Sequence, residues 1–398
     1  MEYSEPLYGI WLSLRYVPGD PTPGRLLSRL RTPSSVYRAK KELLYSLGFS
    51  SAEVRPLSAK SLERAQSIAQ KCAGSGIEVI TYADDRYPVQ FFQLDSPPAV
   101  IYCKGKLPAP DEELFISVVG TRRMSDVGRL NAHRLCFDLA SAGAVVVSGM
   151  ARGIDSVCHE GALDGGGRTV AVLGCGCDVV YPPENGYLYG KIIENGAVIS
   201  EYPPGEEPLA DHFPVRNRLI AALGAATVVA EAGVGSGALI TADRASALGR
   251  TVYAIPGPIS SPSAKGSNLL LKRGAALCTG AEDIISGYEL IYPSKIKADR
   301  ISAKKYFIGN YNTSPDGGGT EQAVQAAGFD TQNVKISRAG ELDGDDRRIY
   351  EELLKRGPMS AEELSAAGID IGKAVYRLTL LEIGGLVVSL PGGKYAVK

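Results

Sequence analysis

Short apolar runs recur along the middle of the chain at nearly even spacing, and they constrain the fold more than any other feature. They begin at 116, 144, 169, 197, 227 and 251, with a weaker run at 275, so the intervals are 24 to 30 residues. Helix-like segments lie between them, such as the one that opens at the predicted cap Ser125 and closes at Gly143. A strand followed by a helix repeats at this length. We therefore expect an α/β fold: a Rossmann-like, doubly wound parallel sheet.

The 398 residues are enough for two or three domains. We expect a small helical module over 1–75, the sheet domain over 76–287, a flexible linker over 288–340 and a winged helix over 341–398. The first segment carries 11 basic and 6 acidic residues. The linker is polar and rich in glycine, as in SPDGGGTEQ. The last segment is typical of three helices followed by a hairpin that turns at 391–393.

The composition excludes several classes of protein. The amino-terminal residues lack the basic and apolar regions of a signal peptide, and glycines interrupt 219–242, an apolar stretch with a single charge, Glu231. Seven scattered cysteines without a CxxC pair are typical of a reducing compartment. A zinc site formed by Cys158 and His159 with Cys175 and Cys177 is not expected. We predict a cytoplasmic protein with no membrane segment and no metal.

Arginine-bearing turns follow several of the predicted strands. They are GTRRMS (120–125), SGMARGID (148–155) and HFPVRNRLI (212–220). Ligands of doubly wound sheets bind beyond the carboxyl ends of the strands, where these turns lie. Arginines that precede helix N-termini favour anions, so we expect a cleft for phosphate or nucleic acid. Phe213 has two interpretations: a stacking platform for a base, or a staple onto its own helix.

Net charge does not indicate a polyanion ligand, because the chain carries −1 overall and its centre is acidic. A nucleic-acid site must therefore be a local cluster. GVGSGA (233–238) fits a dinucleotide turn, but no acidic residue follows at the required distance, where the chain has Ile255 to Gly257. No cofactor is expected. Asp155 and Glu231 lie at the ligand edge, either as general bases or as partners of the arginines.

Taken together, the motifs resemble the DNA-processing protein A family (DprA, also called Smf) of bacterial natural transformation. The resemblance covers roughly 80–285 and rests on segments in family order. They are RYPVQFFQLDSPPAVIYCKG (86–105), VVGTRRMSDVG (118–128), VSGMARGIDSVCHEGAL (147–163), TVAVLGCGCDVVYPPEN (169–185), ISEYPPG (199–205), HFPVRNRLIAAL (212–223), EAGVGSGALITADRASALGRTVYAIPG (231–257) and KGSNLLLKRGA (265–275).

The resemblance implies a protein that binds single-stranded DNA, protects incoming DNA, forms a homodimer and helps to load the RecA recombinase, without catalytic turnover. It also implies a sterile-alpha-motif-like domain at the amino terminus and a winged helix at the carboxyl terminus. It assigns DNA contacts to Arg122, Arg152, Phe213, Arg216 and Arg218. By the same resemblance Ser148, Gly149 and Asn217 shape the pocket. Cys177 and Asp211 depart from the family pattern.

Two other functions are alternatives. Nucleoside-monophosphate phosphoribohydrolases have a similar fold and glycine-rich turn, but Leu239 stands where their catalytic Glu is expected. A regulator that reads duplex DNA through the winged helix would rely on Lys373, Tyr376 and Arg377, in a segment with 8 basic and 10 acidic residues. We expect that segment to bind a protein partner or a second copy of the chain.

Overall fold

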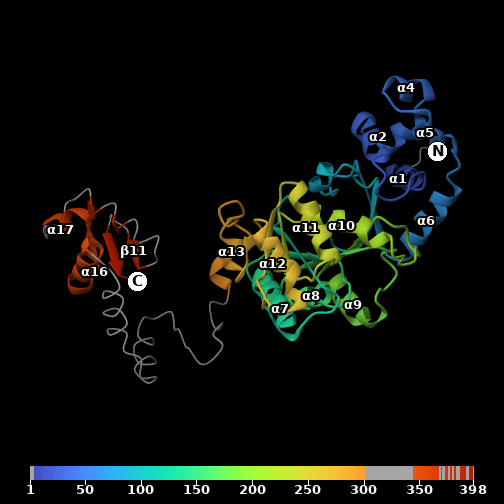
Figure 1. Cartoon of the computed structure of the whole chain (residues 1–398). Helices are drawn as coiled ribbons and strands as arrows, with labels where there is room; N and C mark the ends of the chain where they lie inside the picture. Colours follow the sequence, from blue (N-terminus) through green and yellow to red (C-terminus); the bar gives the residue numbers. More distant parts are fainter. Residues whose placement is uncertain are drawn as a thin grey trace. The chain divides into compact units, whose positions relative to one another are not determined.

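The protein is described from a computed structural model. Its described residues are 4–301, 344–366, 369, 373–374, 377–378, 381, 386–390 and 394–397. The chain divides into two compact units, Met1–Ser302 and Ala303–Lys398. Figure 1 colours the described residues of the first unit from blue to orange and those of the second red.

Within residues 4–301 the strands form one nine-stranded sheet, in the order β1-β2-β6-β5-β4-β3-β7-β8-β9. The strands from β3 onward are parallel to one another. After β3 the chain adds β4 to β6 on one side and then β7 to β9 on the other, which confirms the doubly wound sheet. The seven apolar runs are these strands: β3 (Phe115–Gly120), β4 (Val145–Ser148), β5 (Thr169–Leu173), β6 (Gly196–Ser200), β7 (Ala226–Glu231), β8 (Thr251–Ala254) and β9 (Ala276–Leu277).

Helices cover both faces of this sheet (Figure 1). Alternate residues of a strand point to opposite faces. Ile116 and Val118 of β3 therefore pack with α7, α8 and α13, whereas Phe115 and Val119 pack with α10, α11 and α12. Ser125 caps α7 as predicted, since its Oγ accepts a hydrogen bond from Gly128 N at 3.0 Å. The helices are α7 (Asp126–Ser141), α8 (Ile154–Asp164), α9 (Gly186–Glu194), α10 (His212–Leu223), α11 (Gly237–Ala247), α12 (Lys265–Lys272) and α13 (Glu282–Ile285).

An antiparallel hairpin extends the sheet beyond β6. β1 (Ile77–Thr81) pairs with β2 (Val100–Gly105), and β2 pairs with β6. The spacing of the apolar runs did not predict these strands because only a short 3₁₀ turn, and no α-helix, lies between them. The described residues include the 3₁₀ turns η1 (Arg55–Ser58), η2 (Val89–Gln93), η3 (Pro183–Asn185), η4 (Pro262–Ala264) and η5 (Ala298–Arg300).

The amino-terminal residues are helical and share a core with the sheet. Trp11 is fully buried, and its Nε1 donates a hydrogen bond to Ala59 O at 2.8 Å. The same core includes Tyr102 of β2 and Val198 of β6. The boundary at 75 and the sterile-alpha-motif-like relationship stay predictions. The helices are α1 (Glu5–Ser13), α2 (Thr22–Leu30), α3 (Pro33–Arg38), α4 (Lys41–Ser46), α5 (Ser51–Val54) and α6 (Glu63–Gly74).

The structure differs from the expected linker at its beginning. Ile296 and Ile301 are buried, and Tyr288 and Tyr292 pack against the core formed by α7, α8 and α13. Lys295 forms an ion pair with Glu113, with Nζ 2.9 Å from Oε1. Apolar and aromatic residues at helix-like intervals give 288–301 its own packing, so a linker does not begin at 288. The rest of the expected linker, 302–343, lies outside the described residues.

The second unit contains α16 (Gly344–Arg356), α17 (Ala361–Ala366) and a three-stranded antiparallel sheet ordered β10-β12-β11. The strands are β10 (Met359–Ser360), β11 (Val387–Leu390) and β12 (Lys394–Val397). Ile349 and Leu353 of α16 pack with Leu378 and Leu381 in its core. Most of the expected third helix, Tyr376 included, and the turn at 391–393 lie outside the described residues. The winged helix stays a prediction.

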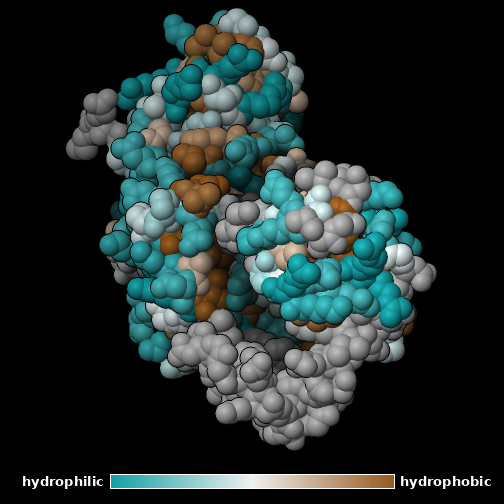
Figure 2. Space-filling model, turned by 90° about the vertical axis from the view of Figure 1, so that its left-hand side faces the viewer, coloured by the Kyte–Doolittle hydropathy of each residue, from teal (hydrophilic) through white to brown (hydrophobic). Residues whose placement is uncertain are grey.

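The surface is mainly hydrophilic on the face shown in Figure 2, where apolar residues form small groups. Exposed large apolar side chains such as Val127 and Leu130 are spread over several elements. In the part of the chain that the structure describes, no helix has the length and apolar character needed to cross a membrane.

Candidate nucleic-acid interface

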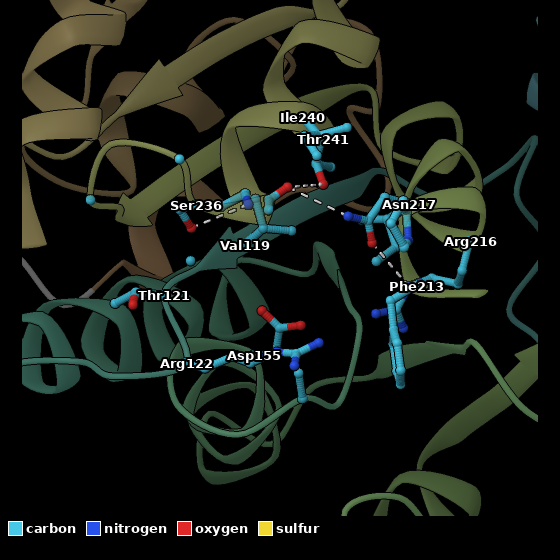
Figure 3. A pocket seen from close by; sticks show the side chains of 18 of the residues that line it. Val119, Thr121, Arg122, Asp155, Phe213, Arg216, Asn217, Ser236, Ile240 and Thr241 are labelled. Atoms are coloured by element: carbon cyan, nitrogen blue, oxygen red, sulfur yellow. Dashed lines mark hydrogen bonds between the residues drawn. The ribbon is translucent and has the colours of Figure 1, made fainter. Parts of the chain in front are cut away.

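A cavity of about 520 Å³ lies beyond the carboxyl ends of β3 and β7. These strands are neighbours, and the chain departs from them to opposite sides, so this is the switch point at which doubly wound sheets bind ligands. Figure 3 shows side chains that converge on it from three sides: the turn after β3 with α8, the first half of α10, and the start of α11. All three arginine-bearing turns line this cavity, but only two of them do so through an arginine: Arg122 and Arg123 in the first, and Arg216 in the third.

Glu231 at the end of β7 holds the two turns of the switch point together. Its backbone oxygen accepts a hydrogen bond from Thr121 N at 2.7 Å, and its Oε2 accepts one from Ser125 N at 2.9 Å. Its Oε1 accepts a hydrogen bond from the Ser263 hydroxyl. The pairing of β3 with β7 shifts register between Val119 and Gly120, which aims the following turn at the cavity. Glu231 therefore has the structural role, with backbone and serine partners in place of the expected arginines.

The turn after β4 needs glycine at two places. Gly153 adopts a φ of 83°, in the left-handed region that favours glycine. A Cβ at Gly149 would lie 2.7 Å from both Arg216 Nη2 and Asp155 Oδ2, so this glycine gives those two side chains their space. Ser148 is fully buried and donates a hydrogen bond to Val118 O at 2.7 Å. Ser148 and Gly149 thus shape the wall behind the cavity.

Phe213 stands at the mouth of the cavity between two guanidinium groups. Its ring centroid is 5.2 Å from Arg122 Cζ and 5.7 Å from Arg216 Cζ. Arg122 is exposed, as is Arg123, whereas Arg216 is 3% exposed. Both pairs lie within the distance of a cation–π interaction. The exposed guanidinium can move away from the ring, but the buried one is held in place.

Arg216 is fixed by carbonyl oxygens at the ends of two strands. Its Nη1 donates to Gly149 O at 2.9 Å and to Val172 O, and its Nε donates to Asn217 Oδ1 at 3.1 Å. Asn217 in turn donates to Gly237 O at 3.5 Å. Arg216 thus joins the end of β5 and the turn after β4 to α10, and Asn217 extends this network to the start of α11.

Asp155 belongs to α8 and lies beside Arg216 of α10, and it is also buried. Burial raises the pKa of its carboxyl above the ordinary value, while the Arg216 charge and the N–H groups of Ala151 and Gly120 oppose the shift. The Asp155 carboxyl and the Arg216 guanidinium lie together at the floor of the cavity. Asp155 is engaged with backbone donors rather than free.

Two of the predicted DNA contacts lie away from the cavity. Arg218 is 5% exposed and pairs with Glu201, with Nη2 2.5 Å from Oε2. Arg152 is exposed and pairs with Glu184, with Nη2 3.1 Å from Oε2. The structure therefore brings together Arg122, Phe213, Arg216 and Asn217, with Gly149 and Ser148 behind them, but not Arg218 or Arg152. Contact with DNA stays a prediction for all eight residues.

The glycine-rich turn at 233–238 is the part of the site that sequence reasoning did not assign. It lines the cavity, and Ser236 caps α11 by accepting a hydrogen bond from Ala238 N at 3.3 Å. The signal was the GVGSGA motif itself, which we compared with a dinucleotide fingerprint and with the glycine-rich turn of the phosphoribohydrolases but not with a DNA site. Thr121 and Thr241 add hydroxyl groups to the lining. Among the described residues, no group of three or more histidine, cysteine or acidic side chains is arranged to bind a metal.

The fold and the site define a Rossmann-like α/β protein with an arginine-lined crevice at the switch point of its sheet. The family model of DNA recombination-mediator protein A matches residues 78–289, and the chain belongs to this family. The DNA processing protein DprA of Streptococcus pneumoniae is 42% identical over 208 residues, which cover 52% of this chain and 72% of that protein. The putative DNA processing protein DprA of Mycobacterium tuberculosis is 34% identical over 342 residues, which cover 82% of this chain and 79% of that protein.

Two solved structures of this family resemble the chain. DprA from Streptococcus pneumoniae has 32% sequence identity and a TM-score of 0.61, with 72% of this chain and 98% of that chain covered. DprA from Helicobacter pylori has 29% sequence identity and a TM-score of 0.50, with 54% of this chain and 97% of that chain covered. The latter structure is described as giving insight into a single-stranded DNA binding mode of that protein.

Proposed function

We propose that the chain binds single-stranded DNA in the cavity at the ends of β3 and β7. The observation that carries this proposal is the Phe213 ring at the mouth, flanked by the exposed Arg122 and the buried Arg216. A base that stacks on Phe213 displaces the Arg122 guanidinium, which then pairs with a neighbouring phosphate. Arg123 and the glycine-rich turn face the same space. Duplex DNA hides its base faces and cannot use the ring.

The membership of the family and the single-stranded DNA mode described for the Helicobacter pylori relative support this function. We extend the proposal to the wider role that the resemblance implies. The chain protects incoming DNA as a homodimer during natural transformation and helps to load RecA onto it.

The proposed role is that of a binding protein rather than an enzyme. Leu239, which replaces the carboxylate of the phosphoribohydrolases, packs against the hydrophobic core of the sheet. The two carboxylates near the cavity are engaged: Glu231 with Ser125 and Ser263, and Asp155 with backbone N–H groups. Neither is positioned by these contacts as a free general base.

We further propose that the carboxyl-terminal unit binds a protein partner or a second copy of the chain. Basic residues of its expected recognition helix face acidic residues of α16: Arg377 Nη1 is 3.2 Å from Asp346 Oδ2, and Lys373 Nζ is 3.9 Å from Asp345 Oδ2. This pairing reduces the positive charge that helix would offer to phosphates.

The test is a titration of purified protein against single-stranded and duplex oligonucleotides of matched sequence and length at moderate salt. We expect clearly tighter binding of the single strand, and Phe213→Ala should remove most of the difference. Equal affinity for both forms would refute the proposal. Incubation with AMP should release no ribose 5-phosphate, and release that Asp155→Ala abolishes would instead support the enzymatic alternative.

A further inference from the structure

A second aromatic ring lies next to Phe213, outside the cavity. The ring centroids of Phe213 and Tyr181 are 5.5 Å apart, with the rings tilted by 39°. Tyr181 follows β5 and is half-buried, and it is not among the residues that line the cavity. Two neighbouring rings, one at the mouth and one beyond it, offer π-faces to two successive bases.

An arginine is held at the segment that carries this second ring. Arg152 forms an ion pair with Glu184, three residues after Tyr181 in the chain. Arg152 belongs to the turn after β4, and its guanidinium is held by Glu184 at the surface, with side chains 60% and 50% exposed. An ion pair this exposed contributes little to stability, so a phosphate can replace the carboxylate at small cost.

The backbone that carries these groups is anchored. Asn185, which follows Glu184, donates hydrogen bonds from Nδ2 to Met150 O at 3.0 Å and to Ser156 Oγ at 2.8 Å. The turn that bears Arg152 and the 3₁₀ turn η3 that bears Glu184 are therefore fastened together. The backbone segments that carry Tyr181 and Arg152 are therefore joined without a ligand, which favours binding because little backbone order has to be gained.

We propose that Tyr181 is a second base-stacking residue and that Arg152 contacts the adjoining phosphate, so that a strand leaves the cavity over Phe213 and continues across Tyr181 to Arg152. This inference rests on the proposed function. Glu184 is a competitor in this scheme, since it occupies Arg152 in the free protein and has to yield when the strand binds.

The experiment measures binding by fluorescence anisotropy with labelled oligothymidylates of about four and about twelve nucleotides, a range that spans the site sizes of single-strand binders. Tyr181→Ala should weaken binding of the longer strand about 10-fold and leave the shorter strand nearly unchanged. Tyr181→Phe should restore binding, because the ring and not the hydroxyl stacks. Tyr45→Ala, a change at a 46% exposed tyrosine on α4, is the matched control and should have no effect.

The ion pair of Arg152 with Glu184 gives an independent test, because changes to its two partners should shift the binding affinity in opposite directions. Arg152→Ala should weaken binding of the longer strand and lower its salt slope by roughly 0.7, the loss of one phosphate contact. Glu184→Gln should have the opposite effect and tighten binding, because it releases Arg152.

The outcomes separate this inference from the proposed function. Loss of binding in Phe213→Ala with no effect of Tyr181→Ala would refute only the second stacking position. No effect of either variant would refute the proposed function itself. If Tyr181→Ala weakened both strands equally and lowered the melting temperature, Tyr181 would be a structural support of Phe213, and the inference would be wrong.

Discussion

The two sides of helix α10 use arginine in opposite ways. Arg216 and Arg218 are two residues apart, so they point about 200° apart around the helix axis. Arg216 faces the cavity, close to the exposed Arg122 and the ring of Phe213. Arg218 faces Glu201 after β6, where Glu201 also accepts a hydrogen bond from the backbone of Gly19. One sequence cluster, RNR, therefore contributes to the candidate site and to an internal contact between the sheet and the amino-terminal segment.

This difference shows what an arginine motif alone does not reveal. Both side chains are buried to a similar degree, at 3% and 5% exposure. The acidic partner decides the role: Glu201 lies within 2.5 Å of Arg218, whereas Arg216 bonds to carbonyl oxygens beneath an open cavity. Arg218 is explained by its ion pair within the fold, whereas we propose that Arg216, beside Asp155 and beneath an open cavity, serves a ligand.

The strongest test of the comparison is Arg218→Ala. Removal of the arginine leaves the Glu201 charge buried without its partner, so we expect a loss of about 3–5 kcal/mol in the free energy of unfolding. Denaturant unfolding followed by circular dichroism measures it. The double variant Arg218→Met with Glu201→Leu should recover most of the loss, since no charge is left behind.

The contrary result would restore the sequence-based assignment. If Arg218→Ala kept its stability but lost single-strand affinity and lowered the salt slope by roughly 0.7, Arg218 would be a phosphate ligand.

Acid should lower the stability of the folded protein through His159 on α8. Its Nδ1 lies 2.7 Å from Thr169 Oγ1, and burial, aided by the Arg216 charge, lowers the pKa of the imidazole to about 3. The unfolded chain has a histidine pKa of about 6.5, so the stability from this group is complete above that pH and is lost as the pH falls toward the folded value. The expected loss at about pH 5 is about 2 kcal/mol relative to neutral pH.

Unfolding measured across this pH range checks the prediction. His159→Gln should remove the pH dependence, whereas His133→Gln, a change at a half-exposed histidine on α7, should keep it. A wild-type protein whose stability did not change between about pH 7 and about pH 5 would contradict it.

Arg122→Ala separates the exposed arginine from the buried ones. We expect single-strand affinity to fall about 10-fold and the salt slope to fall by roughly 0.7, with stability changed by no more than about 0.5 kcal/mol. Phe213→Ala should weaken binding by a similar factor without a change in salt slope, because the ring carries no charge. Arg273→Ala, at an exposed site after α12, is the control and should bind as the wild type does.

The smallest effect is expected from deletion of residues 341–398. That segment carries 8 basic and 10 acidic residues, and its Arg377 and Lys373 are paired with acidic residues. Single-strand affinity should change less than about threefold, because the segment adds no net positive charge for phosphates. A titration of the truncated chain measures it, and a large loss would show that this unit binds DNA.

The sequence by itself determined the sheet and the edge at which the site lies. Apolar runs at strand-plus-helix spacing predicted β3 to β9, and the rule that ligands bind beyond the carboxyl ends of parallel strands placed Arg122 and Phe213 near one another. These inferences succeed because they depend on local periodicity and on chain direction, which every residue of a run shares. The hairpin of β1 and β2 was missed because its strands are antiparallel and no α-helix separates them.

Only the tertiary structure decided which side chains meet. Two of the contacts join residues that are far apart in the sequence: Arg218 meets Glu201, 17 positions away, and Phe213 meets Tyr181, 32 positions away. The exposure of Arg122 likewise depends on its tertiary surroundings. Neighbours in sequence, such as Arg216 and Arg218, point in opposite directions on a helix, and residues far apart in sequence meet where strands end. A motif therefore locates the candidate side chains, but their burial and the charged residues next to them determine what each one does.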